Sequence, residues 1–358
     1  MTVSGGARVE YLSEPYYESL IAEARGQAPA ASTEAMCDAW LAPLPTRGRN
    51  RGNGLAILFD PDDRDAPSSA KTIRHILRLA RSNGIEASVI GPGDLPRLAE
   101  FGALWIRCHT SPRNFTYAFA RLAEHLGLPV LDDSRAIRLC GNKIYLAERL
   151  AAHEIAMPQS VIVTAATRID DLEAVLSYPM VVKVPDGSFS RSVAKADNRN
   201  VLKLILSEML FKSHLILAQE YMPTSFDWRI GLLEGEPLFA CQYRMAQGHW
   251  QIIKHRPGQT SLEGPFRSVP LARVPADVLS LSVTASTAMG NGLHGVDLKQ
   301  ADRGVFVIEV NDNPNIDRGV EDRAEGALPW LRILGWFREQ MVGAASTLPL
   351  IAGSVQPL

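Results

Sequence analysis

The segment HGVDLKQADRGVFVIEVNDNPNID, residues 294–317, decides how this chain is interpreted. Two runs in which apolar and polar residues alternate flank a short polar turn that ends in glycine. This pattern predicts a β-hairpin with a three-residue loop. Pairing Ala301 with Val305 across that loop places Asp297 directly opposite Glu309. Two carboxylates are therefore expected to lie side by side in a sheet.

These opposed carboxylates repel each other unless something neutralises them. Side chains alternate between the faces of a hairpin, so Asn311 and Lys299 share the face of Asp297 and Glu309. The oxygens of the two acids and of Asn311 suit Mg²⁺, or alternatively Mn²⁺, with coordination positions left for phosphates. On a solvated face the acids would instead pair with Lys299 or Arg318, and the residues alone leave both interpretations open. The other face is apolar and is expected to pack on a core: Val296, Leu298, Phe306, Ile308 and Val310.

A polar loop, residues 311–317, follows the second strand directly and is fixed by Pro314. Side chains in such a position can line a site where a strand ends, although an ordinary hydrogen-bonded turn uses the same residue types. Asn315 in this loop is a candidate contact for a substrate.

The composition is that of a globular protein, with 358 residues of which 46% are hydrophobic and 21% charged. The net charge of −2 argues against a nucleic-acid or membrane partner, because both require a sustained basic face. The first residues lack a secretory signal, and no apolar run is long enough to cross a bilayer. The four scattered cysteines form no metal-type or redox-type pair. These features predict a cytoplasmic protein.

The chain before residue 158 predicts a helical extension followed by a small α/β unit. Residues 9–40 have helical spacing, and residues 43–54 have the composition of a linker. A longer helix is expected from Asp133 through Lys143 towards His153, and the rest mixes strands and helices as in an α+β domain. Between the linker and Asp133, strands and helices alternate, which implies a doubly wound parallel sheet. The expected strands are 55–59, 87–90, 103–106 and 128–131, and the expected helices are 70–82 and 115–126.

The paired segments GVDLK (295–299) and IEVNDNP (308–314) resemble the metal-binding end of ATP-grasp ligases, and most closely that of the RimK-type amino-acid ligases. The resemblance covers roughly residues 133–325. It implies a small doubly wound pre-ATP-grasp domain followed by a two-lobed ATP-grasp domain. The expected parts are a helical extension and linker (1–53), a pre-ATP-grasp domain (54–133), an ATP-grasp domain (134–345) and a tail (346–358).

The resemblance also assigns nucleotide contacts. Lys143 in CGNK and Lys183 in VVKVP take positions that contact ATP phosphate, Lys183 also on the adenine side. Ser190 lies in the phosphate loop DGSFSRSV (186–193), which has fewer glycines than many loops of the family and offers hydroxyls instead. The hinge that meets adenine and ribose contains Gln219, Glu220, Tyr221 and Met222.

A second hairpin is expected around the turn Glu234-Gly235. If Leu233 pairs with Glu236, four polar side chains share one face: Asp227, Arg229, Gln242 and Arg244. Two arginines with few acids suit an anion, because the guanidinium fork matches phosphate and carboxylate. A surface ion pair between Asp227 and Arg229 is the structural alternative. The resemblance places Asp227 towards ribose, and Arg229 and Arg244 towards phosphate and acyl-phosphate.

Substrate contacts are expected from two further places. Lys254 lies in the alternating segment 248–255 and could hold a carboxylate. His249 or His255 in that segment could accept a proton from an attacking amine, although incidental residues of an exposed strand would look the same. At the end of the strand that closes with Ile106, Arg107 and His109 are also candidates.

The implied chemistry is amide formation through an acyl-phosphate. A carboxylate is a poor acylating group until the γ-phosphoryl of ATP is transferred to it. The resemblance implies an ADP-forming carboxylate–amine ligase that uses ATP and Mg²⁺ and acts on amino-acid or peptide substrates, with Arg244, Arg229 and Asn311 as catalytic residues. Ligases of this type often associate, so a homo-oligomer is one state to consider. A phosphotransferase and a nucleotide-binding module without catalysis are the alternatives.

Overall fold

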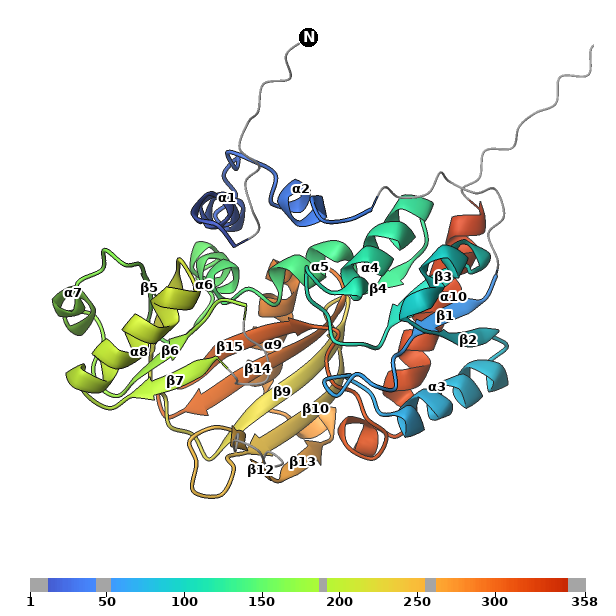
Figure 1. Ribbon diagram of the computed structural model, residues 1–358. Helices are drawn as coiled ribbons and strands as arrows, with labels where there is room; N and C mark the ends of the chain where they lie inside the picture. The colour runs from blue at the N-terminus through green and yellow to red at the C-terminus, as the bar shows by residue number, and fades with distance from the viewer. Residues whose placement is uncertain (1–11, 43–52, 187–191, 255–261, 347–358) are drawn as a thin grey trace, which may run out of the picture.

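A computed structural model describes residues 12–42, 53–186, 192–254 and 262–346. The chain folds around three main sheets, and a two-stranded ladder, β11–β12 (Ile253–Lys254 and Leu262–Glu263), is added to them. Figure 1 shows the parallel sheet at one end of the molecule, the smaller antiparallel sheet at the other, and the five-stranded sheet between them. Elements from three different stretches of the chain can therefore meet at the central sheet.

The first sheet has the order β2-β1-β3-β4, and all of its pairs are parallel. Alternate residues of β1 and β3 enter two separate cores, one shared with α3 and α10 and the other with η1 and α4. Helices thus cover both faces, which confirms the predicted doubly wound arrangement. The elements are β1 (Leu55–Leu58), α3 (Ala70–Ser82), β2 (Ala87–Ile90), η1 (Pro92–Glu100), β3 (Ala103–Ile106), α4 (Phe115–Leu126), β4 (Val130–Leu131) and α10 (Leu328–Ser346).

The N-terminal extension, expected to be mostly helical over residues 9–40, contains two helices in its described part. They are α1 (Glu14–Ala24) and α2 (Thr33–Asp38), and each begins after a serine whose hydroxyl accepts a backbone N–H. The first helix ends before Gly26, which has φ +73°, a value that favours glycine. α1 packs against α6, and α2 against α5.

The helix predicted from Asp133 to His153 is likewise interrupted. It consists of α5 (Ser134–Leu139) and α6 (Lys143–Ala152). Asn142 separates them, because its side-chain oxygen accepts the N–H groups of Ile144 and Tyr145 and so starts a new helix. Lys143 is therefore the first residue of α6 rather than a residue within a continuous helix.

The small lobe is an antiparallel sheet of order β5-β8-β6-β7 with helices on one face. Its apolar side chains pack on α7 and α8. The opposite face carries Lys183 and Gln219 and is directed towards the central sheet. The elements are β5 (Ser160–Val163), α7 (Ile169–Glu173), β6 (Met180–Lys183), β7 (Val193–Ala196), α8 (Arg199–Lys212) and β8 (Ile216–Glu220).

The large lobe is built on the sheet β13-β10-β9-β14-β15, whose core face is covered by α9 (Ala276–Met289). Its strands are β9 (Phe226–Leu233), β10 (Glu236–Arg244), β13 (Phe266–Val269), β14 (Leu293–Ala301) and β15 (Gly304–Asp312), with the short turns η2 (Leu271–Arg273) and η3 (Glu321–Arg323). The predicted hairpin that contains Asp297 and Glu309 is β14–β15, and the second predicted hairpin is β9–β10.

The β14–β15 hairpin confirms the pairing of Asp297 with Glu309. The turn is shorter than predicted, because Ala301 pairs with Gly304, and a bulge at Ile308 restores the register. As far as the bulge, the shorter turn also reverses which side chains of β15 face the core. Val305 and Val307 are buried there, whereas Phe306 and Ile308 are half-buried. The expectation that Phe306 and Ile308 face the core is therefore wrong.

The β9–β10 hairpin has the predicted turn, with Leu233 opposite Glu236. A bulge at Leu238 then shifts the register by one residue, so that Arg229 lies opposite Cys241 and Asp227 opposite Tyr243. Arg244 pairs with Phe226 and is exposed at the strand end. The prediction that Arg244 and Gln242 share a face with Arg229 is wrong, because one unpaired residue reverses every later side chain.

Candidate active site

The site is centred on the carboxylate face of β14 and β15. Arg229 on the neighbouring strand β9 lies opposite Asp297. Its Nε and Nη2 atoms donate to the two oxygens of Asp297, each at 2.7 Å. The Arg229 guanidinium also lies 5.5 Å from the centre of the Tyr243 ring. This two-pronged contact fixes the orientation of both charged groups.

Glu309, the second carboxylate, is paired with a lysine from a different part of the chain. Lys143 Nζ lies 3.0 Å from Glu309 Oε1. Burial opposes the charge on Glu309, but Lys143 and Lys183 outweigh it and hold the pKa of this carboxyl below its usual value. Asn311 shares the same face, and its Nδ2 lies 3.3 Å from Asp297 Oδ2. The start of α6 and the central sheet thus meet at one point.

Asp227 forms its own ion pair at the edge of this face. Lys299 Nζ lies 2.6 Å from Asp227 Oδ1 and 2.8 Å from Thr224 Oγ1. Arg229 is engaged with Asp297, so the surface pair between Asp227 and Arg229 does not form. Asp297 and Glu309 are neutralised by Arg229 and Lys143, and not by Lys299 or Arg318 as the solvated alternative required.

The small lobe contributes cations on the side that faces the carboxylates of the central sheet. Lys183 Nζ donates to Gln219 Oε1 at 2.7 Å, and Gln219 in turn donates to Ser160. Burial lowers the pKa of Lys183 to about 8 in spite of nearby Glu309. Lys195 on β7 was missed by the sequence reasoning. Its ammonium lies 5.2 Å from the centre of the Tyr221 ring and 2.8 Å from Asp197. It could have been predicted from its position, because it lies two residues after Val193 on the strand that follows the phosphate loop.

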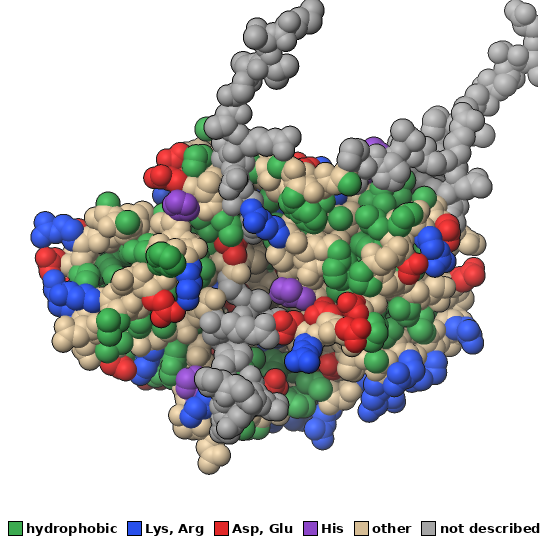
Figure 2. Space-filling view, viewed as in Figure 1, with side chains coloured by type: hydrophobic (Ala, Val, Ile, Leu, Met, Phe, Trp, Pro, Cys, Tyr) green, Lys and Arg blue, Asp and Glu red, His purple; other side chains and the backbone are tan. Residues whose placement is uncertain are grey.

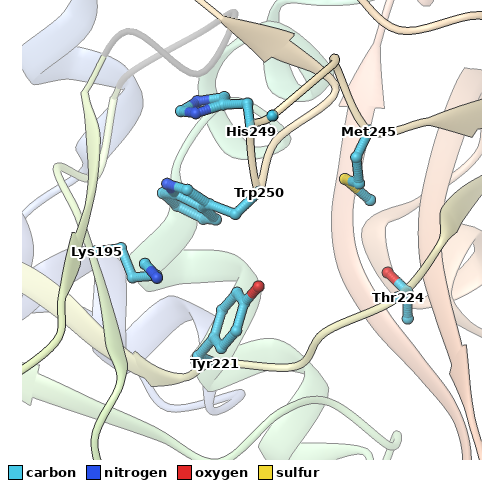
Figure 3. Close-up of a pocket in the computed structure, with 7 residues that line it drawn as sticks. Lys195, Tyr221, Thr224, Met245, His249 and Trp250 are labelled. Carbon is cyan, nitrogen blue, oxygen red and sulfur yellow. The ribbon is translucent and has the colours of Figure 1, made fainter.

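A pocket of about 430 Å³ opens where the hinge meets the large lobe. Figure 3 shows Trp250 and His249, from the loop after β10, facing Tyr221 and Lys195 across it. The Tyr221 and Trp250 rings meet edge to face, with centres 5.9 Å apart. The other lining residues are Thr224, Met245 and Gly248. In the space-filling view, charged side chains of both signs lie along the boundary between the small lobe and the rest of the molecule (Figure 2).

The other hinge residues flank Tyr221 in the chain. Glu220 pairs with Arg303 at the end of the β14–β15 hairpin, and Met222 is buried. Lys254 is half-buried on β11, opposite Leu262. The strand expected over residues 248–255 is reduced to Ile253–Lys254, because residues 245–252 form a turn closed by a bond from Ala246 N–H to Gln251 O. Ser190 and His255 lie outside the described residues.

Arg107 does not face the cleft, and its prediction as a substrate contact is wrong. Its side chain is fully buried, and burial lowers its pKa to about 10. Nη1 donates to Asn313 Oδ1 at 2.7 Å, and Nη2 donates to the backbone oxygens of Pro67 and Pro314 at 2.8 and 3.0 Å. Arg107 therefore anchors the loop behind Asn311, while Asn315 in the same loop is half-buried. His109 is tied to Asp63 through its backbone N–H.

The donor set at β14–β15 fits a hard divalent cation. Two carboxylates and one amide oxygen would leave positions for phosphates and water, as Mg²⁺ prefers. Within the described residues no group of three or more His, Cys, Asp or Glu side chains is arranged to hold a metal by itself. A metal bound by Asp297, Glu309 and Asn311 would therefore depend on the nucleotide to complete its coordination.

Comparison with known protein families identifies the arrangement. A model of the RimK-like ATP-grasp domain matches residues 140–324. The chain belongs to the RimK-like ATP-grasp family. The match begins at the turn before Lys143 and ends after the loop that follows β15, so it includes both lobes and the carboxylate face.

Individual relatives agree with this assignment to the RimK-like family. The chain is 30% identical over 199 residues to the alpha-aminoadipate–LysW ligase LysX of Saccharolobus solfataricus, covering 54% of this chain and 69% of that protein. It is 27% identical over 266 residues to a probable alpha-L-glutamate ligase of Thioalkalivibrio sulfidiphilus, covering 69% and 85%. The expected enzyme class, an ATP-dependent carboxylate–amine ligase, is confirmed by these relatives.

Solved structures share the fold of this RimK-like chain. A D-alanine–D-alanine ligase from Bacillus anthracis superposes with a TM-score of 0.65 at 16% identity, covering 83% of this chain and 99% of that one. A RimK domain protein from Sphaerobacter thermophilus superposes with a TM-score of 0.59 at 17% identity, covering 79% and 98%. The predicted fold class is confirmed, while the expected domain boundaries stay predictions. No helix in the described parts of the chain has the length and hydropathy needed to span a bilayer.

Proposed function

We propose that this protein transfers the γ-phosphoryl of ATP to the carboxylate of an amino acid or peptide and then joins the resulting acyl-phosphate to the amino group of an amino acid. The observation that carries this proposal is the opposed pair Asp297 and Glu309, each already in contact with a cation, Arg229 or Lys143. Carboxylates and cations arranged in this way are suited to bind a triphosphate and its metal. A hairpin with only a structural function does not require them.

The residues around the carboxylate face supply positioning and charge. Asp297, Glu309 and Asn311 would hold Mg²⁺, which when bound neutralises phosphate charge. Lys143 and Arg229 contact the same two carboxylates, so their ammonium and guanidinium groups lie beside the phosphates that such a metal would bring. Lys183 adds charge from the small lobe. Little covalent chemistry is asked of the protein, because the reacting groups need chiefly to be aligned and neutralised.

The nucleotide base and ribose are assigned to the hinge. Among the hinge residues Gln219, Glu220, Tyr221 and Met222, Tyr221 lines the pocket, and Asp227 accepts a hydrogen bond from Thr224, which lines it as well. Gln219 and Lys183 are already joined by a hydrogen bond, which orients the ammonium for phosphate. Ser190 stays a prediction of the family resemblance. Lys195 is added as a further cation on the same face.

We assign stabilisation of the acyl-phosphate to Arg229 in preference to Arg244. Negative charge collects on the acyl-phosphate and on the tetrahedral adduct that follows attack by the amine. Arg229 lies on the carboxylate face, whereas the bulge at Leu238 turns Arg244 to the other side of β10. Lys254 and Asn315 remain candidates for substrate contact. Oligomeric association and cytoplasmic location also stay predictions.

The test is ADP release from MgATP with crossed pools of carboxylates and amino acids, followed by mass spectrometry of any active pair. A product with the mass of acid plus amine minus water supports the ligase. ADP release that needs no amine and yields a phosphorylated acid would show a phosphotransferase instead. MgATP binding without turnover in any pool would favour the nucleotide-binding module.

A further inference from the structure

The N-terminal helices lie outside the matched residues 140–324, yet they are tied to the nucleotide site. Figure 1 shows α1 and α2 lying across α6 and α5. Two ion pairs fasten α1 there. Arg25 lies 2.6 Å from Glu148 on α6, and Arg138 on α5 lies 3.0 Å from Glu23. The extension is therefore held against the helix that begins with Lys143.

One side chain of the extension reaches the start of the phosphate loop. Tyr17 on α1 is 1% exposed, and its hydroxyl donates to Asp186 Oδ2 at 3.0 Å. The other oxygen of Asp186 accepts from Asn142 Nδ2 at 2.9 Å. Lys143 N–H donates to Pro185 O at 2.9 Å. Asp186 thus joins α1, the start of α6 and the end of β6.

These contacts matter because Asp186 carries a negative charge close in sequence to a residue assigned to ATP phosphate. It follows Lys183 by three residues, and Asn142 directly precedes Lys143. If this carboxylate turned towards the two lysines assigned to phosphate, it would compete for them and would repel the triphosphate. Donors on both oxygens hold the group in one orientation and satisfy its charge.

Tyr17 is suited to be a permanent donor. Burial and the charge of Asp186 raise its pKa above the usual tyrosine value, so the hydroxyl keeps its proton at physiological pH. An ionised phenol beside Asp186 would place two negative charges together, and the buried setting prevents that.

We propose that Tyr17 is a positioning residue of the nucleotide site, which holds the Asp186 carboxylate away from the phosphates of MgATP. The N-terminal extension thereby becomes part of the machinery that binds nucleotide, and Tyr17 acts there through Asp186. This inference rests on the proposed use of MgATP. It adds a determinant of affinity that lies outside the matched ATP-grasp region.

The chain contains a matched control for this contact. Tyr117 is also buried, and its hydroxyl donates to Asp38 Oδ1 at 3.0 Å, which likewise joins the extension to the body of the protein. That bond lies between α2 and α4 and does not involve Asp186. A purely structural function of Tyr17 predicts equal effects of Tyr17→Phe and Tyr117→Phe.

The experiment measures MgATP binding to the full chain by titration calorimetry, with thermal unfolding recorded for each variant. We expect Tyr17→Phe to raise Kd for MgATP about fivefold to tenfold and Tyr117→Phe less than about twofold, because only the first releases a charged group near the phosphates. In the steady state, KM for ATP should rise with little change in kcat. Equal effects of the two variants, or no effect of Tyr17→Phe, would overturn the proposal.

A second variant tests the connection through Asp186. Asp186→Asn removes the negative charge, so Tyr17→Phe added to it should change Kd for MgATP less than about twofold. The same loss with Asn at position 186 as with Asp would overturn the proposal. If the wild-type chain binds MgATP but turns over no substrate pair, the ligase proposal fails, while these Kd comparisons still decide the function of Tyr17.

Discussion

The hairpins β14–β15 and β9–β10 lie side by side in one sheet, and each contains one bulge, yet the sequence predicted the site correctly in one and incorrectly in the other. In β14–β15 the turn is one residue shorter than predicted, and the bulge at Ile308 compensates, so Asp297 still faces Glu309. In β9–β10 the turn is as predicted, and the bulge at Leu238 is not compensated.

This difference shows which part of a hairpin can be predicted from alternation. The register at a site depends on the turn length and on every bulge between turn and site, and neither leaves a strong signal in one sequence. The carboxylate pair was supported independently by its family motif. That Arg244 shares a face with Arg229 was inferred from alternation and an assumed register, and that inference failed, although the family resemblance had assigned both arginines to phosphate groups.

The largest expected effect concerns the carboxylate pair. Glu309→Gln keeps the size of the side chain and removes its charge, so we expect turnover with MgATP to fall about 100-fold or more. The unfolding midpoint should change little, because the amide oxygen still accepts from Lys143. Glu236→Gln, at the exposed turn of β9–β10, is the control and should retain full activity. Activity retained in Glu309→Gln would contradict the metal site.

The second prediction compares the two arginines directly. Arg229→Lys loses the two-pronged contact with Asp297, and we expect kcat/KM to fall about 10- to 100-fold. Arg244→Lys should change it less than about threefold, because Arg244 is exposed on the other face. Steady-state kinetics measure both. A larger loss for Arg244→Lys would contradict the bulge at Leu238 and would support the predicted register, in which Arg244 shares the face of Arg229.

Sequence reasoning was most successful where a single local pattern suffices. The strands of the parallel sheet are short and mostly apolar, and all four were located. Arg107 was misassigned because its burial depends on Ser68 and Asn313, which are distant in sequence. The break before Lys143 depended on a cap by Asn142 that a continuous helical pattern conceals. Long-range partners and backbone irregularities thus account for these errors.

Strand β6 has no register shift and offers a third, smaller test. Lys183 has a pKa of about 8, so its ammonium is charged below that pH and loses its proton above it. We expect Kd for MgATP to rise by up to about tenfold per pH unit above pH 8, because binding then requires uptake of a proton. Lys183→Arg keeps its charge and should flatten the profile. A flat wild-type profile between pH 8 and about 9.5 would contradict the assignment of Lys183 to phosphate.

The smallest expected effect tests the bulge at Ile308 through stability alone. Val307 is 1% exposed and packs in the core, whereas Ile308 is half-buried on the carboxylate side. Val307→Thr buries a hydroxyl in the core, so we expect the free energy of unfolding in urea to fall by about 1–3 kcal/mol. Ile308→Thr should lower it by about 1 kcal/mol or less. The reverse order would mean that the hairpin has the predicted three-residue turn and no bulge, because Ile308 would then lie opposite Leu298 on the core face. Asp297 would face Glu309 in that register as well, so this measurement separates the two ways in which the hairpin can bring the carboxylates together.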